Sequence, residues 1–176
     1  VEATATMLYA AMIRKGYTHV AEFHYLHNDK NGKPYSNLVE MGERLIAAAM
    51  TAGINITLIP VLYKTGNFGE GPQPRQRRFI SQTIDSYLLL LNATADVVSK
   101  NHNSRLGFGI HSLRAVDLAD IVTTFREGPK TIPFHLHAAE QLKEVEDCMA
   151  YCKRRPIEWR LESLPVSERV HLVHCT

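Results

Sequence analysis

Two histidines and a glutamate stand close together in the stretch 131–148, which reads TIPFHLHAAEQLKEVEDC. His135 and His137 alternate at the end of an apolar run, and Glu140 follows where the pattern becomes helical. Residues two apart on a strand point to the same face, so both imidazoles are expected to point into the same interior. A neutral imidazole is a good zinc ligand, and a carboxylate beside it can move the proton of an activated water. The spacing therefore suits a hydrolytic metal site, with Glu140 expected to begin the next helix.

Histidines also stand near the ends of other apolar runs. In parallel α/β proteins the chemistry collects at the carboxyl ends of the strands. A single histidine near a strand end is more often a core or solvent-facing residue, but several histidines at such positions weaken that interpretation. Five of the nine histidines stand near the end of an apolar run: His24, His111, His135, His137 and His174.

Five runs of strand length alternate with segments of helical spacing. The runs are dense in apolar residues, which is typical of strands buried on both faces. Strict alternation of strands and helices predicts a parallel sheet with right-handed crossovers. The expected strands are 18–25, 55–63, 105–112, 131–138 and 169–175, and helical spacing is found over 4–14, 38–48, 79–91, 118–125 and 142–152.

Two α/β architectures fit this pattern. A (β/α)₈ TIM-type barrel typically needs about 250 residues, so five units would form a little over half of one. The alternative is a complete doubly wound sheet, although no glycine-rich phosphate loop follows the first run. The chain begins inside an expected helix without an initiator methionine and stops at an uncovered strand. We therefore expect residues 1–176 to be the central part of a larger barrel.

Composition narrows the class of protein. The chain is 45% hydrophobic and 22% charged, with a formal net charge of +2. Its charges are interspersed, which argues against a nucleic-acid or membrane surface, and no apolar run is long enough to span a bilayer. The cysteines number three and lack metal-site spacing, so they indicate reduced thiols. We expect a soluble, cytoplasmic protein.

Four stretches together resemble the formimidoylglutamate deiminase family of the amidohydrolase superfamily: VAEFHY, GIHSLRAV, FHLHAAEQLKEVEDC and LVHC. The resemblance runs from Gly16 to Thr176. It implies a metal-dependent (β/α)₈ barrel, of which this chain would supply strands two to six. It further implies hydrolysis of N-formimino-L-glutamate to N-formyl-L-glutamate and ammonia, in histidine degradation.

The resemblance assigns the reacting centre to three residues. His137 matches a zinc ligand, Glu140 the proton shuttle, and His174 the histidine that contacts the substrate at the reacting carbon. The family's further metal ligands, a His-x-His pair on the first strand and an aspartate on the eighth, fall outside this stretch of the barrel. His135 is interpreted as a packed residue or one that supports the ligand from behind. No organic cofactor is implied.

The same resemblance matches Tyr25, His111 and Arg114 to residues that hold the glutamate part of the substrate. The guanidinium fork of Arg114 suits a carboxylate on physical grounds as well. For each of these residues a structural interpretation stays open, most of all for Tyr25, because a tyrosine at a strand end is often simple packing.

Two other functions remain open. One is another amidohydrolase deaminase, acting on a guanine-like or cytosine-like base, which would not need an arginine for a carboxylate. The other is an inactive fragment without a working metal site. A homodimer is compatible with the sequence, which does not fix the oligomeric state.

Overall fold

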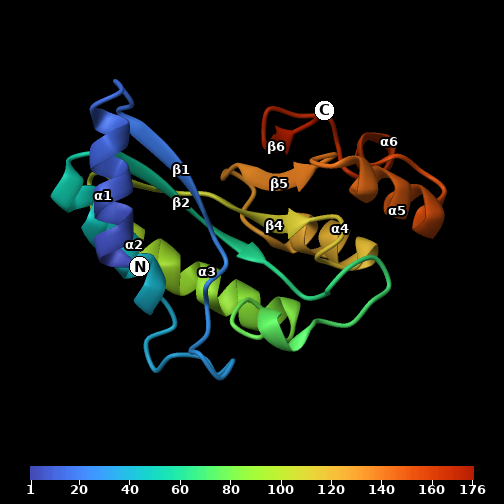
Figure 1. Cartoon of the computed structure of the whole chain (residues 1–176), viewed down its shortest axis with the longest axis horizontal. Coiled ribbons are helices and arrows are strands. Elements are labelled where there is room, and N and C mark those ends of the chain that lie inside the picture. Colours follow the sequence, from blue (N-terminus) through green and yellow to red (C-terminus); the bar gives the residue numbers. More distant parts are fainter.

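The computed structural model describes all residues from Val1 to Thr176. Its centre is a sheet in which every paired strand is parallel to its neighbour (Figure 1). The main path runs β1-β2-β4-β5-β6, and the short β3 pairs with β2. The strands are β1 (His19–His24), β2 (Asn55–Leu62), β3 (Ser104–Leu106), β4 (Phe108–Ser112), β5 (Phe134–Ala138) and β6 (Val170–His174).

This strand order decides between the two architectures. A doubly wound sheet reverses its strand order at a switch point, whereas here each strand on the main path lies beside the next in chain order. Sequential parallel strands joined by helices are the arrangement of a TIM-type barrel. The prediction of a barrel segment is therefore confirmed.

Helices join the strands and follow the curve of the sheet, from α1 and α2 at one end to α5 and α6 at the other (Figure 1). A short 3₁₀ helix, η1 (Pro74–Gln76), lies in the long loop between β2 and α3. The α-helices are α1 (Glu2–Ile13), α2 (Glu40–Ala52), α3 (Ile84–Ser99), α4 (Leu118–Glu127), α5 (Leu142–Cys152) and α6 (Pro156–Ser163).

The hydrophobic core has two parts. One lies around β4 and β5 and includes Phe108 and Phe134, whose ring centroids are 5.1 Å apart. The other lies between β2 and the helices α1 and α2. Five apolar residues of β2 are fully buried, on both faces of the sheet, as the dense apolar run predicted: Ile56, Leu58, Ile59, Val61 and Leu62.

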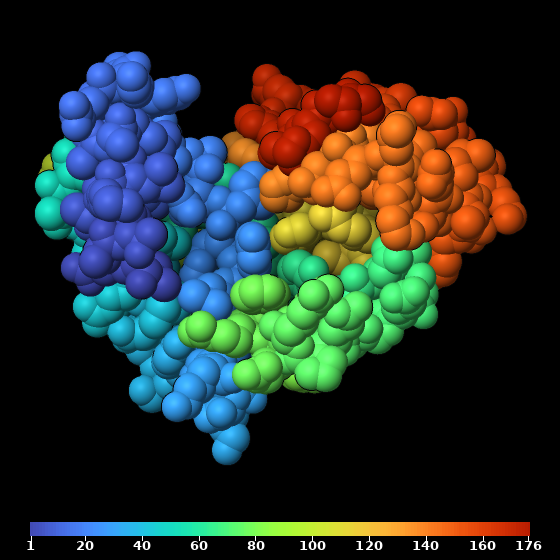
Figure 2. Space-filling model, viewed as in Figure 1, coloured from blue at the N-terminus to red at the C-terminus, as the bar shows by residue number.

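The sheet is an open arc with β1 and β6 at its two edges. In the space-filling view a notch separates the N-terminal part, in blue, from the C-terminal part, in red (Figure 2). None of the helices is both long and apolar enough to cross a membrane.

Two of the expected elements differ from the structure, and one helix was not expected. The run 105–112 is split at Gly107 into β3 and β4, which both pair with β2, while only β4 also pairs with β5. The helix expected over 79–91 begins only at Ile84, since the side chain of Thr83 caps it by accepting a hydrogen bond from the Ser86 amide. The helix α6 was not predicted, although Pro156 stands at its first turn, where proline is favoured.

Gly109 is expected to be indispensable for the contact between β4 and β5. A Cβ atom built on it would lie 2.0 Å from the carbonyl oxygen of His135, which is backbone and has little room to move. Gly109→Ala should therefore destabilise the fold by about 3 kcal/mol or more, judged from the usual cost of overpacking. Thermal melting of the intact protein measures this loss. Gly71→Ala is the matched control, because its Cβ would meet nothing within 4 Å, and an equal loss in both variants would contradict the argument.

Candidate active site

A cavity of about 330 Å³ opens at the carboxyl ends of the strands. Parallel strands bring these ends to one edge of the sheet, so residues far apart in sequence meet there. Ala21, Glu22 and Phe23 of β1 complete the wall. All six residues predicted for the site line this single cavity: Tyr25 after β1, His111 on β4, Arg114 after β4, His137 on β5, Glu140 in the β5–α5 loop and His174 at the end of β6.

The imidazole of His137 is oriented by the backbone of the neighbouring strand. Its Nδ1 lies 2.7 Å from the carbonyl oxygen of His111. A carbonyl can only accept, so Nδ1 carries the proton and Nε2 keeps its lone pair. Burial lowers the pKa of His137, although the bond to the His111 carbonyl opposes this effect. The ring is therefore neutral at physiological pH, in the tautomer that can ligate a metal through Nε2.

Glu140 does not begin the helix, as the sequence had suggested. It lies in the loop between β5 and α5, which begins only at Leu142. The carboxylate accepts a hydrogen bond of 3.0 Å from Nη2 of Arg114, and this bond is the main reason why the pKa of Glu140 lies below its usual value. The carboxylate is thus ionised at neutral pH and ready to accept a proton.

His174 lies near the other oxygen of the same carboxylate. Its Nε2 lies 3.9 Å from Oε1 of Glu140, and its ring centroid is 5.5 Å from that of His137. The backbone of His174 has φ 74, in the left-handed region that non-glycine residues seldom adopt. Such strain persists only where the surroundings enforce it, and it often marks functional positions.

Arg114 makes a second ion pair that the sequence pattern did not predict. Its Nη1 lies 3.0 Å from Oε2 of Glu144, a residue of α5 that is itself buried. The guanidinium therefore bridges Glu140 and Glu144. An arginine offers five N–H donors, so donors remain for a ligand in the cavity.

Aromatic rings surround His111. The ring centroid of Tyr25 lies 5.0 Å from that of His111, and that of Tyr63 lies 4.8 Å away. Phe79 packs against both tyrosines. Burial, assisted by the charges of His137 and Arg114, lowers the pKa of His111 to about 3, so this ring is neutral. Tyr63 could have been found at the end of the second apolar run, whereas Phe79 was hidden by its assignment to a helix.

His135 is placed differently from His137. It does not line the cavity but packs with its ring centroid 4.8 Å from that of His171 and 6.0 Å from that of Phe23. Burial lowers its pKa to about 4, and the nearby His171 adds to this effect. His135 is therefore a neutral, packed residue at a deeper level of the sheet.

The residues of this chain fit part of a zinc site. His137 is a neutral imidazole with an available Nε2, which is what a zinc ion requires of a histidine ligand. The structure contains no cluster of three or more histidine, cysteine or acidic side chains able to hold a metal ion. The chain thus offers one well-prepared ligand and an adjacent carboxylate.

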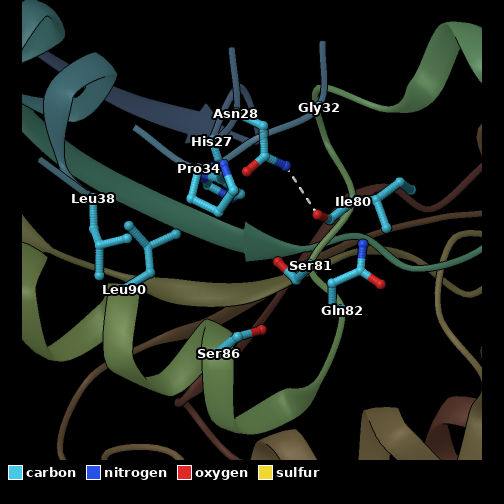
Figure 3. A pocket seen from close by; sticks show the side chains of 10 residues that line it. All are labelled: His27, Asn28, Gly32, Pro34, Leu38, Ile80, Ser81, Gln82, Ser86 and Leu90. Carbon is cyan, nitrogen blue, oxygen red and sulfur yellow. Dashed lines mark hydrogen bonds between the residues drawn. The ribbon is translucent and has the colours of Figure 1, made fainter. Parts of the chain in front are cut away.

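A second cavity, of about 140 Å³, lies between the β1–α2 loop and the N-terminal end of α3 (Figure 3). None of the six predicted site residues lines it. Here the side chain of Asn28 donates a hydrogen bond of 3.0 Å to the carbonyl of Ile80, which ties the loop to the segment before α3 (Figure 3). His27 bonds to the Val61 carbonyl at 3.1 Å. These contacts hold the loop that follows Tyr25 and so support the wall of the first cavity.

The chain is similar over its whole length to part of a curated enzyme. The chain is 44% identical over 178 aligned residues to formimidoylglutamate deiminase of Pseudomonas aeruginosa, and the alignment includes 100% of the chain. The resemblance to formimidoylglutamate deiminase is confirmed. The chain spans 39% of the length of that curated deiminase. No family model matches it.

The chain is also similar to solved structures. An amidohydrolase from Brucella melitensis superimposes with a TM-score of 0.90 at 41% identity, covering 99% of this chain and 39% of that one. More distant structures share the fold alone. A triazine hydrolase from Arthrobacter aurescens gives a TM-score of 0.71 at 14% identity, covering 98% and 37%. An adenosine deaminase from Xanthomonas campestris gives 0.68 at 20%, covering 98% and 34%.

Proposed function

We propose that this chain is the central part of a metal-dependent amidohydrolase that converts N-formimino-L-glutamate and water to N-formyl-L-glutamate and ammonia, as a step of histidine degradation. The observation that carries the proposal is one cavity in which His137 presents a metal-binding nitrogen beside an ionised carboxylate and an arginine. The 44% identity to a formimidoylglutamate deiminase supports the choice of substrate.

We propose zinc as the metal. Two structures of the same fold, the adenosine deaminase and an atrazine chlorohydrolase from Arthrobacter aurescens, contain zinc. His137 would be one ligand, and the remaining ligands would come from outside these residues. A bound zinc ion supplies a water molecule that is acidic enough to act as a nucleophile near neutral pH.

Glu140 is assigned the proton transfer. Its ionised carboxylate accepts a proton from the attacking water and returns it to the nitrogen that leaves the formimino carbon as ammonia. His174, whose Nε2 lies 3.9 Å from the Glu140 carboxylate, is assigned to stabilise the charge that develops at that carbon. One water is consumed and one ammonia is released: the C=N bond of the formimino group is exchanged for a C=O bond, and both hydrogens of the water leave with the ammonia.

We assign the glutamate part of the substrate to the part of the cavity formed by Arg114, Tyr25 and His111. The free donors of Arg114 suit a carboxylate, and Tyr25 with the neutral His111 forms a wall that can donate hydrogen bonds. A cytoplasmic location is proposed as well, and the free thiols of Cys148, Cys152 and Cys175 are consistent with a reducing compartment.

Arg114→Met tests the substrate. The variant keeps much of the stem volume but removes the charged donors, so turnover of N-formimino-L-glutamate should fall about 10–100-fold more than turnover of a formimino compound that lacks both carboxylates. Both kcat/KM values are measured on the protein from the complete gene, by ammonia release. Arg114→Lys should recover only part of the difference, because lysine lacks the planar fork.

Comparing two substrates matters because Arg114 also contacts Glu140. A loss of that contact lowers the turnover of both compounds, whereas the loss of a carboxylate partner affects only one. Equal losses for the two substrates would mean that Arg114 contacts only Glu140 and Glu144 and does not bind a carboxylate of the substrate. A deaminase of guanine-like or cytosine-like bases would then be the better interpretation.

A further inference from the structure

Glu144 is a buried acid beside the cavity. Its side chain is only 1% exposed, and a buried carboxylate is costly unless it is paired and hydrogen-bonded. Here it receives three donors: Nη1 of Arg114 at 3.0 Å and the Glu140 amide at 3.1 Å on one oxygen, and the Ala139 amide at 3.3 Å on the other. All three donors belong to the β5–α5 turn or to the arginine that contacts Glu140.

The turn that Glu144 binds has an unusual backbone. Ala139 has φ 55, in the left-handed region. Successive amides around such a residue form a concave site for an anion. Glu144, the third residue of α5, reaches back past the N-cap residue Gln141 to the amides of Ala139 and Glu140. The other side of the turn is held by the end of β6, where the hydroxyl of Thr176 donates to the Ala139 carbonyl at 2.6 Å.

We propose that Glu144 is a positioning residue for the proton transfer assigned to Glu140, an inference that rests on the proposed function. One carboxylate fixes both the backbone that carries Glu140 and the guanidinium that binds its side chain. Glu144 thereby sets the direction of the Glu140 carboxylate and leaves the remaining donors of Arg114 facing the cavity. Misplacement of a catalytic group by about 1 Å can cost about 100-fold in rate.

Glu144→Gln removes the negative charge that faces Arg114. Glutamine has one accepting oxygen in place of two, and Nη1 of Arg114 shares its carboxylate oxygen with the Glu140 amide. The NH₂ group therefore faces either the Ala139 amide or this pair of donors, and in both orientations Arg114 loses its charged partner. We expect the variant to fold and to bind zinc, while kcat falls about 10–100-fold for substrates with and without carboxylates.

A double variant tests the route of the effect. If Glu144 acts through Glu140, then Glu144→Gln should cost little in a protein that already carries Glu140→Gln, since residues acting as a unit are non-additive. Glu144→Asp should recover part of the rate, because it keeps the charge but is one methylene shorter. Glu146→Gln is the matched control: it lies on the same helix, is exposed, and should leave turnover unchanged.

The outcomes separate clearly. An unchanged kcat per zinc-loaded Glu144→Gln protein, with only a lower Tm, would make Glu144 a helix cap and overturn the proposal. A full additional loss in the Glu140→Gln background would also overturn it. If the wild type does not act on formimino-glutamate, the proposed function fails by itself. A crystal structure of Glu144→Gln then still decides the inference, which requires Arg114 and the Glu140 carboxylate to be displaced. If Glu144→Gln does not fold, the same measurements on Glu144→Asp decide it.

Discussion

Glu140→Gln should lower the turnover of N-formimino-L-glutamate by about 10²–10⁴-fold, the usual contribution of a general acid–base residue. Glutamine has nearly the shape of glutamate and can still accept the hydrogen bond from Arg114, which is 3.0 Å long in the structure. The change therefore removes the ability to take up a proton and little else. Steady-state kinetics on the protein from the complete gene give the loss in kcat.

Zinc content decides how that loss is interpreted. We assign Glu140 to proton transfer and not to metal binding, so the variant should contain as much zinc as the wild type. A large loss of zinc would make Glu140 a ligand. Undiminished turnover would exclude Glu140 from the reaction altogether, whatever the metal content.

The contacts of Glu140 are a part of the site that the sequence did not predict. The family resemblance gave six of the residues that line the cavity, and each of them stands near the end of an apolar run, where parallel strands bring such ends together. It did not give the bridge from Arg114 to Glu140 and Glu144, because that bridge depends on how the β5–α5 turn is folded. The left-handed Ala139 has no sequence signal, since such conformations are expected at glycine or asparagine.

The pattern of apolar runs predicted some features of the sheet and missed others. Dense apolar runs predicted the parallel sheet, and strand order, which only the structure gives, decided for the barrel. The break at Gly107 was hidden because β3 and β4 together look like one run; both pair with β2, whereas only β4 also pairs with β5. The apolar pattern reports burial and does not give the partners of a strand.

His137 and His135 provide the sharpest test of the metal assignment, because they share a strand and differ in what they face. His137→Ala removes the imidazole whose Nε2 is available in the cavity. Loss of a supporting contact already weakens metal binding about 10–100-fold, and loss of a ligand should cost more. Zinc affinity, measured by competition with a chelator on the protein from the complete gene, should therefore fall more than about 100-fold, and activity with it.

His135→Ala should behave differently. His135 packs against Phe23 and His171, and its Nε2 has no hydrogen-bond partner. Its removal therefore leaves a small void in the sheet interior, which lowers the Tm without taking a bond away from the metal. Zinc content at saturating metal should stay close to that of the wild type. If instead His135→Ala loses zinc and His137→Ala keeps it, the ligand lies one layer deeper in the sheet, and the reacting centre must be rebuilt around His135.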